Sequence, residues 1–333
     1  MAFKKHGIML RRAYINAVSN GRVQNMRQLS SSKCLLNKQR ARAELLFQDL
    51  IQGNRAALAQ SITLIESTLK ASKIEAQNLL SLVNAHVNAN HNDTFRIGLS
   101  GPPGAGKSTF IEIFGTQLTE RGHKVAVLAV DPSSARRGGS LLGDKTRMTE
   151  LSRNPNAYIR PSPNRGHLGG VARTTNESIL LCEAAGYDVV LVETVGVGQS
   201  EYLVADMVDA FCLILSPGGG DELQGIKRGI IELCDLVLIN KCDGDLVPAG
   251  NRTKAEYTSA LKLMQPKSEF WRTKVMKMSS KNDKGIDEAW DSLVEFKEVM
   301  ISNGEFTRLR ANQQKAWMWH YIQSKMLEVD YHF

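Results

Sequence analysis

The stretch Gly101-Pro102-Pro103-Gly104-Ala105-Gly106-Lys107-Ser108-Thr109 decides the fold of this chain. It matches the pattern G-x-x-x-x-G-K-[ST] at every required position. The mostly apolar run at residues 95–99 before it is typical of a strand, and residues 110–114 after it are typical of a helix. Strand, glycine-rich turn and helix in this order predict a loop whose N–H groups and helix N-terminus hold phosphates. We expect the whole stretch to contact a nucleoside triphosphate, with Lys107 on the β- and γ-phosphates and Ser108 on Mg²⁺.

Two further apolar runs are each followed directly by an acidic residue. The run at residues 124–130 ends in Asp131, and the run at residues 187–192 ends in Glu193, with Gly196 three residues later. Runs that are apolar on both faces indicate central parallel strands, and the carboxyl ends of such strands present ligands. Asp131 and Glu193 are therefore candidates for Mg²⁺ and its waters, and Gly196 for sensing the γ-phosphate through its N–H. For Asp131 the alternative is a turn or helix cap, and for Glu193 a structural carboxylate.

The strand at residues 236–239 ends in Asn240-Lys241-Cys242-Asp243, the pattern N-K-x-D. A carboxylate at its last position accepts hydrogen bonds from guanine N1–H and N2–H₂, which adenine lacks, and an unpaired acid is costly. The base is therefore predicted to be guanine, read by Asn240, Lys241 and Asp243. The last strand, residues 275–278, leads to Ser279-Ser280-Lys281, which we expect to close the base pocket from the other side.

Two glycine-rich segments are candidate switch loops. Residues 135–175 are rich in arginine and glycine, and the alternative for them is a solvated loop without a switch role. After the strand at residues 211–215 comes a loop over residues 216–227, with Asp221 as a candidate helix cap. Its predicted switch residues are Gly218, Gly219, Gly220, Asp221, Glu222, Gln224 and Lys227.

Strands alternating with helices predict an α/β fold with a doubly wound, mainly parallel sheet. We expect four regions: a leader at 1–43, a helical region at 44–92, a nucleotide-binding domain at 93–290 and a C-terminal helical segment at 291–333. In the helical region, the apolar stripe Leu58, Ile62, Ile65 and Leu69 predicts one helix, and a second is predicted to begin near Ile74. The aromatic residues of the last segment, Trp317, Trp319 and Tyr321, are either core or a partner contact.

The charge of the chain is concentrated at its start. The net charge is +8, and residues 1–43 hold ten basic side chains and no acidic one, so +8 less +10 leaves −2 for the rest. A nearly neutral body gives no support for nucleic-acid binding. The arginine-rich, acid-free leader is typical of a mitochondrial transit peptide and favours the matrix, with a disordered basic tail as the alternative.

Cysteine spacing and hydropathy exclude other classes. The five cysteines form no C-x-x-C pair or metal-ligand spacing, which fits a reducing compartment. No apolar run approaches the roughly 18 residues that cross a bilayer, so no membrane association is expected.

Taken together, the motifs resemble the MeaB/ArgK family of GTPases. The resemblance covers about residues 44 to 325. It rests on the P-loop, Asp131-Pro-Ser-Ser, residues 143–148 (GDKTRM), residues 193–201 (ETVGVGQSE), residues 218–227 and the N-K-x-D pattern. It implies a GTPase of the SIMIBI class, related to metallochaperones, that attends methylmalonyl-CoA mutase. Such proteins use GTP binding and hydrolysis to gate delivery of adenosylcobalamin, the client's cofactor, and to help eject inactivated cofactor.

The resemblance also implies roles for single residues. It places Lys107 and Ser108 on phosphate and Mg²⁺, sets Asp131, Asp144 and Glu193 around the metal and the attacking water, and makes residues 216–227 the link to the mutase. The sequence departs from Ras-type GTPases at Val197, where no glutamine orients water, so slow intrinsic hydrolysis raised by the partner is expected. It departs from the family by ending at Phe333, without the arm used for dimerisation, which puts a homodimer in doubt.

Three other functional classes fit the residues less well. A small-molecule kinase needs no guanine selectivity, which Asp243 opposes. A targeting GTPase of the signal-recognition type needs a basic or methionine-rich module, which the body lacks. A metallochaperone GTPase for another metalloenzyme is the alternative function, although its expected cysteine or histidine clusters are absent, and the histidines are scattered.

Overall fold

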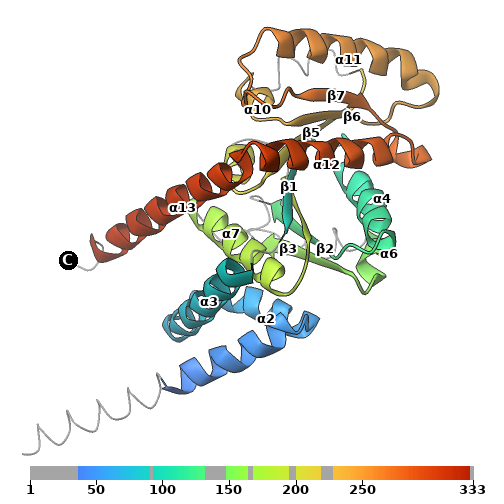
Figure 1. Cartoon of the computed structure of the whole chain (residues 1–333). Helices are drawn as coiled ribbons and strands as arrows, with labels where there is room; N and C mark the ends of the chain where they lie inside the picture. The colour runs from blue at the N-terminus through green and yellow to red at the C-terminus, as the bar shows by residue number, and fades with distance from the viewer. Residues whose placement is uncertain are drawn as a thin grey trace, which may run out of the picture. The chain divides into compact units, whose positions relative to one another are not determined.

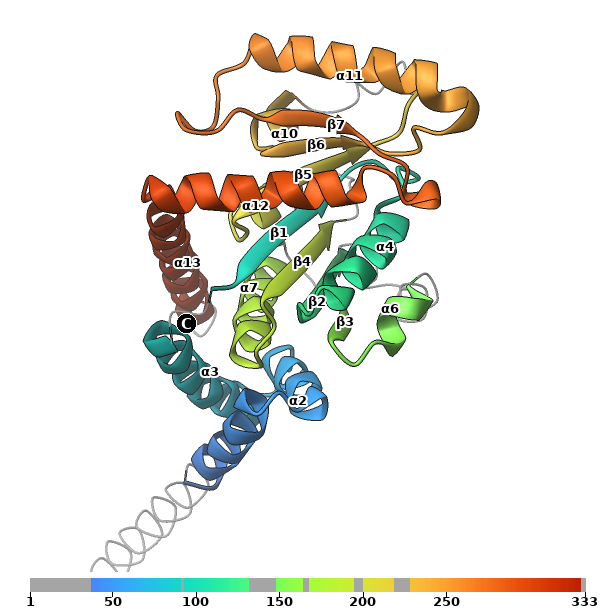
Figure 2. The same cartoon turned by 45° about the vertical axis from the view of Figure 1, so that its right-hand side comes forward.

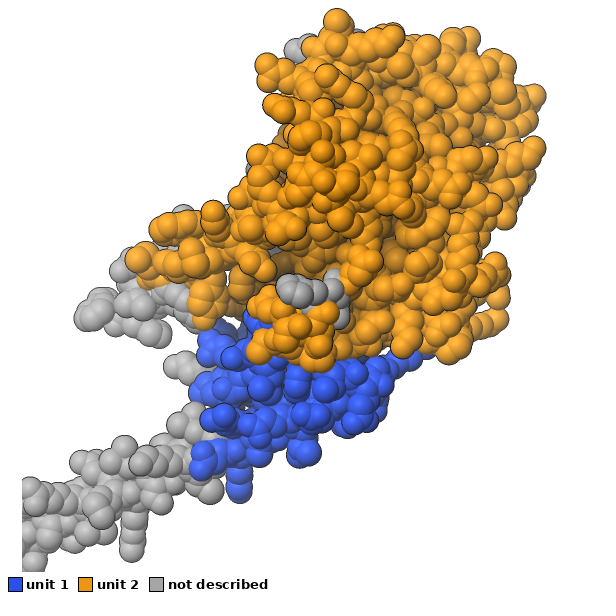
Figure 3. All heavy atoms as spheres, in the orientation of Figure 1, with its two compact units in different colours: residues 1–84 blue, residues 85–333 orange. Residues whose placement is uncertain are grey.

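The computed structural model of this 333-residue chain describes residues 37–90, 93–131, 148–163, 168–194, 200–218 and 228–330. The chain divides into two compact units, residues 1–84 and 85–333, which Figure 3 colours separately. The division falls inside helix α3 (Lys70–Asn90). Across the described residues, no helix has both the length and the hydropathy needed to span a membrane.

The first unit is helical, as the stripe predicted, but the stripe is shorter than expected. A helix at residues 37–51 is followed by α2 (Arg55–Ile65), whose N-cap Asn54 accepts hydrogen bonds from the N–H groups of Ala56 and Ala57. Leu58, Ile62 and Ile65 are buried, whereas Leu69 lies between the helices and is 68% exposed. The Ser67 hydroxyl accepts a hydrogen bond from the N–H of Leu69, and such local bonds compete with a continuing helix. The prediction for Leu69 was therefore wrong, and α3 begins at Lys70 rather than near Ile74.

The second unit is built on a parallel sheet of seven strands in the order β3-β2-β4-β1-β5-β6-β7, which confirms the predicted fold class (Figure 1). Every residue of β1, β5 and β6 is buried, because helices cover both faces of a doubly wound sheet. The strands are β1 (Phe95–Ser100), β2 (Val125–Asp131), β3 (Ala157–Pro163), β4 (Val189–Thr194), β5 (Ala210–Leu215), β6 (Leu236–Ile239) and β7 (Lys274–Lys277).

The helices form two layers around this sheet. Phe110 and Phe114 of α4 (Lys107–Glu120) share a buried apolar cluster with Leu293 and Phe296 of α12 (Ile286–Ser302). Helix α7 (Leu168–Ala184) packs against β2 and β4, and α8 (Ser200–Ala205) packs against β1 and β4. The remaining helical elements are α6 (Thr149–Arg153), α10 (Arg228–Glu232), η2 (Gly244–Leu246), α11 (Val247–Lys262), η3 (Ser280–Asn282) and α13 (Glu305–Asp330). The expected boundary at residue 290 lies inside α12, whose buried face belongs to this core.

The segment at residues 135–175 is not one long loop, so that prediction was wrong where the structure describes it. Residues 132–147 and 164–167 lie outside the described residues, but α6, strand β3 and the start of α7 lie between and after them. Ala157 and Ile159 of β3 are buried. The strand carries Pro161 and Pro163, which an edge strand tolerates because its outer N–H groups need no partner.

A buried acid on α7 makes stability depend on pH. Burial raises the pKa of Glu177 to about 7, and Arg173, at 3.7 Å, offsets this only in part. The pKa of Glu177 is higher in the folded protein than in the unfolded one. The contribution of Glu177 to the free energy of unfolding is therefore complete below its ordinary pKa of 4.5 and is lost as the pH rises to about 7. Relative to wild type, Glu177→Gln should be close to neutral below pH 4.5 and more stable by up to about 3 kcal/mol above pH 7. Urea unfolding of both proteins at several pH values measures this difference, and a difference independent of pH would contradict it.

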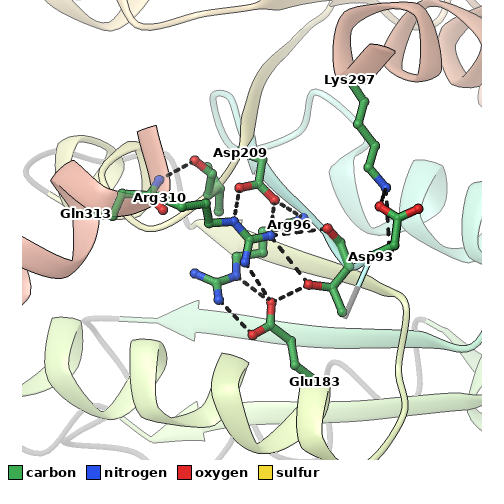
Figure 4. A network of polar contacts seen from close by, with 9 residues as sticks. Asp93, Arg96, Glu183, Asp209, Lys297, Arg310 and Gln313 are labelled. Carbon is green, nitrogen blue, oxygen red and sulfur yellow. Dashed lines mark hydrogen bonds and ion pairs between the residues drawn. The ribbon is translucent and has the colours of Figure 1, made fainter. Parts of the chain in front are cut away.

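A buried ionic cluster fastens α13 to the amino-terminal ends of the strands (Figure 4). Arg96 of β1 binds Glu183 of α7 through two hydrogen bonds of 2.6 and 2.7 Å. Arg310 of α13 donates to Asp209, just before β5, at 2.6 Å and to Glu183 at 3.3 Å. Burial alone would raise the pKa of Glu183, but the two arginines hold it below its ordinary value. The cluster therefore joins helix α13 to β1, α7 and the start of β5.

Removing one arginine from this cluster should destabilise the second unit. In Arg310→Met, the fully buried carboxylate of Asp209 loses its guanidinium partner, and breaking a buried ion pair costs about 3–5 kcal/mol. Arg308→Met is the matched control, because Arg308 forms an exposed pair with Glu305 on the same helix and such pairs contribute about 0–1 kcal/mol. Urea midpoints of the three proteins measure both effects; equal midpoints for the two variants would contradict the prediction.

Candidate functional site

Three loops converge at the carboxyl edge of the sheet. The P-loop follows β1, Glu193 lies near the end of β4 in register with Leu99 of β1, and Asn240 directly follows β6. Parallel neighbouring strands bring these ends together, and this edge is where open α/β sheets hold ligands. The strands that carry these residues thus end along one edge of the sheet (Figure 2).

The P-loop has the backbone geometry that its glycines permit. Gly101 has φ +149°, and a Cβ there would lie 2.0 Å from the carbonyl oxygen of Ile214 on β5. Gly106 has φ +92° and caps α4, and a Cβ there would lie 2.5 Å from the side-chain nitrogen of Asn240. A side chain at either position would therefore push the loop off its neighbours. The loop ends at the N-terminus of α4, where the helix dipole favours an anion.

The side chain of Lys107 is held in place by the P-loop backbone. Its side chain is buried, and Nζ donates to the carbonyl oxygens of Gly101 at 2.7 Å and Pro102 at 3.2 Å. Burial lowers the pKa of Lys107, while the charges of Glu193 and Glu201 act to raise it. The ammonium group therefore bridges the loop and lies in a region of negative charge from Glu193 and Glu201.

The oxygen donors beside Lys107 fit Mg²⁺. The Ser108 hydroxyl donates to Oε1 of Glu193 at 3.3 Å, so a hydroxyl from α4 and a carboxylate from β4 meet. Mg²⁺ prefers oxygen ligands and is usually bound by one or two protein groups together with waters and substrate phosphates. Ser108 and Glu193 supply such groups; Glu193 is half-buried, which leaves it reachable from solvent.

Asn240 ties the base-binding side of the site to the P-loop. Its side-chain nitrogen donates to the carbonyl oxygen of Ala105 at 3.0 Å. Its side-chain oxygen accepts hydrogen bonds from both the N–H and the hydroxyl of Ser280 at 2.9 Å. Asn240 is buried, so this link is shielded from water. The loops after β1, β6 and β7 are thereby joined into one rigid frame.

The two other residues of the N-K-x-D pattern point into the same region. Lys241 has φ +59°, one of two positive values among the described non-glycine residues, and its Nζ donates to the carbonyl oxygen of Gly104 at 2.6 Å. This hydrogen bond ties the side chain of Lys241 to the P-loop. The Ser279 hydroxyl donates to Asp243, which fixes one carboxylate oxygen and leaves the other for a ligand. Lys281 is exposed at the start of η3.

Several predicted residues lie outside the described part of the chain. Asp144, Gly196 and residues 219–227 are in this group. Asp131 is the last residue of β2, with its backbone in register with Pro163. Gly218 is exposed with φ +92° and begins the predicted switch loop after β5.

Two features of the site were not predicted. Glu201 of α8 is 1% exposed, and its charge acts on Lys107, although the sequence showed it only as part of a longer motif. The bond between Asn240 and Ala105 joins residues far apart in sequence, and no spacing signals it. Among the described residues, no three His, Cys, Asp or Glu side chains are grouped to hold a metal ion.

This geometry can bind a phosphate chain, carry Mg²⁺ and read a purine. Backbone N–H groups, Lys107 and the dipole of α4 converge where phosphates would lie. The carboxylate of Asp243 offers acceptors for the N–H groups of a guanine, and adenine lacks those donors.

Comparison with known proteins gives the same result. The model of the family described as "Methylmalonyl Co-A mutase-associated GTPase MeaB" matches residues 58–331. A mouse protein named "Methylmalonic aciduria type A homolog, mitochondrial" is 58% identical over 300 residues, which cover 88% of this chain and 72% of the relative. "GTPase ArgK" of Escherichia coli is 47% identical over 278 residues, covering 84% and 83%. A crystal structure of an "LAO/AO transport system kinase" superposes with a TM-score of 0.74 at 39% identity, covering 86% of this chain and 85% of that one. The chain therefore belongs to the MeaB family of P-loop GTPases, and it is a GTP hydrolase.

Proposed function

We propose that this GTPase is a chaperone of methylmalonyl-CoA mutase, in which GTP binding and hydrolysis gate the delivery of adenosylcobalamin and protect or reactivate the mutase. The observation that carries the proposal is the match of residues 58–331 to a family described by its association with that mutase. The assembled nucleotide site supports it, because a chaperone driven by GTP needs a site that binds and hydrolyses GTP. Adenosylcobalamin enters the proposal only as the client's cofactor.

Within the site, we assign phosphate binding to residues 101–109 and catalysis to Lys107 with Asp131, Asp144 and Glu193. The contact of 3.3 Å between Ser108 and Glu193 supports their assignment to Mg²⁺, with Asp131 as a further ligand at the end of β2. Asn240, Lys241 and Asp243 read the guanine, and residues 279–281 close the pocket. Gly196 senses the γ-phosphate, and residues 218–227 carry the nucleotide state to the mutase.

Location in the mitochondrial matrix is part of the proposal. The names of the mouse and Caenorhabditis elegans relatives place those proteins in mitochondria. The basic, acid-free composition of residues 1–43 supports import of this chain as well. Fusion of residues 1–43 to a fluorescent reporter tests this location, and a reporter that stays in the cytosol would overturn it.

The chaperone role is tested by following mutase activity during prolonged turnover. With this protein and GTP present, the mutase should lose activity more slowly than with this protein and GDP. Lys107→Ala should give no protection with GTP, because it lacks the group that holds the phosphates. Lys124→Ala, an exposed lysine before β2, is the matched control and should protect as wild type does.

The alternative is a GTPase that serves a different metalloenzyme. The same assay separates the two functions. Protection that is equal with GTP, with GDP and with Lys107→Ala would remove the mutase as a client, even though GTP hydrolysis itself would stand.

A further inference from the structure

Strand β7 is the last strand of the sheet, and among the described residues its only strand partner is β6. The N–H of Met278 donates to Ile239, and the carbonyl of Met278 accepts from Cys242, so the backbone of Met278 faces β6. Because strand residues alternate in direction, Lys274 and Met276 also turn their backbone groups toward β6. The N–H and C=O groups of Val275 and the N–H of Lys277 therefore point outward from the sheet, whereas the carbonyl oxygen of Lys277 lies against Gly285, where an added Cβ would approach it to 2.7 Å.

The side chains of β7 alternate between two helices. Lys274 pairs with Glu295 of α12, and Met276 packs against the core cluster that contains α12. Lys277 donates to Asn251 of α11. Even-numbered residues thus face α12 and odd-numbered residues face α11, and Figures 1 and 2 both show β7 between these helices.

A cavity of about 910 Å³ wraps around the outer edge of β7. Its lining includes residues from both helices and from β7 itself, so it extends across the strand edge from one face of the sheet to the other. The wall formed by α11 is basic, with Lys254 and Lys262 two turns apart. The wall formed by α12 is acidic, with Glu288 and Asp291 one turn apart.

The charged groups of these walls are available to a ligand. Lys254, Lys262, Glu288 and Asp291 are all exposed, and within the described chain their side chains form no ion pair. Lysines on an edge strand commonly prevent unspecific pairing of that edge with other chains. In β7, however, Lys274 is bound to Glu295 and Lys277 is bound to Asn251, so neither side chain extends over the strand edge as a free charge. The strand edge between the walls is therefore left for a specific partner.

We propose that the outer edge of β7 binds an extended segment of a partner protein, in which acidic and basic side chains alternate. Such a segment would add an eighth strand to the sheet, and its main chain would bond to the N–H and C=O of Val275 and to the N–H of Lys277. Successive side chains of a strand point to opposite faces, so every second residue meets the basic wall of α11 and the others meet the acidic wall of α12. Opposite charges at these positions supply the specificity.

The residues of β7 lie close in sequence to residues of the nucleotide site. Strand β7 ends at Lys277, and Ser279 and Ser280, which hold Asp243 and Asn240, follow at once. A partner that fixes β7 would therefore act next to the base-reading loop.

Two peptides test the proposal on the full chain. The probe is a fluorescent octapeptide in which glutamate and lysine alternate, and its comparator has four glutamates followed by four lysines, with the same composition and net charge. Fluorescence anisotropy should show that the alternating peptide binds at least about tenfold more tightly. Hydrogen exchange at the amides of Val275 and Lys277 should slow when it binds. Equal affinity for the two peptides, or no binding up to about 1 mM, would overturn the proposal.

Variants of β7 and of the walls formed by α11 and α12 distinguish main-chain pairing with β7 from general charge attraction. Val275→Pro removes an outward N–H without touching the bonds to β6 and should weaken binding about tenfold, whereas Val275→Ala keeps the N–H and should bind as wild type does. Replacing both Lys254 and Lys262 by glutamate makes both walls acidic and should weaken binding about three- to tenfold. Adding Glu288→Lys and Asp291→Lys should restore binding, because the two walls have then exchanged their charges and the peptide can shift by one residue to exchange its two faces. Retained GTP hydrolysis shows that each variant is folded, and failure of the charge-exchanged variant to bind would refute the alternation.

Discussion

Lys107→Ala should lower kcat for GTP hydrolysis by about 10²–10³-fold, the loss expected when one preorganised charge-stabilising donor is removed. In the structure, Nζ of Lys107 donates hydrogen bonds to the carbonyl oxygens of Gly101 and Pro102 at the N-terminus of α4. Its burial means that the ammonium group has left bulk water, so its attraction to a phosphate is strong and costs little reorganisation. Single-turnover hydrolysis of GTP measures the chemical step.

The matched control for this variant is Lys124→Ala, because Lys124 is exposed at the opposite end of β2. It should hydrolyse GTP at the wild-type rate. If Lys107→Ala, correctly folded, hydrolysed GTP within about threefold of wild type, the lysine would have no role in stabilising charge during phosphate transfer.

Asp243→Asn should change the base selectivity of the site from guanine to xanthine. Asp243 accepts one hydrogen bond from Ser279 and leaves acceptor positions for two donors of guanine. Losing two bonds to a charged group costs about 3–6 kcal/mol, so the affinity for GTP should fall by about 10²–10⁴-fold. Asparagine presents an N–H₂ group that suits the oxygen at position 2 of xanthine, so binding of XTP should improve. Competition of GTP and XTP for a fluorescent nucleotide measures both changes.

The frame around Asp243 provides the control for that experiment. Ser280→Ala removes one of the two bonds from Ser280 to Asn240 but leaves the carboxylate of Asp243 in place. It should weaken GTP and XTP alike and leave the preference for GTP unchanged. An Asp243→Asn protein that still preferred GTP would show that another residue reads the base.

The sequence was sufficient for the core strands and for the position of the site. Strands β1, β4, β5 and β6 are buried on both faces, so their sequences are mostly apolar, and the motif residues stand at or just after the carboxyl ends of β1, β4 and β6. Once the sheet is parallel, Ser108, Glu193 and Asn240 must lie along one edge. The contact between Ser108 and Glu193 follows from this topology.

Other features could not be predicted because they depend on distant partners. Strand β3 is an edge strand whose second half, Arg160 to Pro163, is polar and carries two prolines, so it has no apolar run. Helix α7 starts with glycines and threonines, which hide its helical pattern. Nothing near Arg310 in the sequence indicates that it binds Asp209 and Glu183, which precede it by more than a hundred residues.

The proposed coupling of this GTPase to methylmalonyl-CoA mutase is tested most directly by the rate of GTP hydrolysis at increasing concentrations of the purified mutase, with ATP as the control nucleotide. The proposed function predicts slow turnover of GTP alone, a rate that rises and saturates as mutase is added, and no turnover of ATP. Lys107→Ala should stay at background throughout. A GTP rate that is the same with and without mutase would contradict the proposed function.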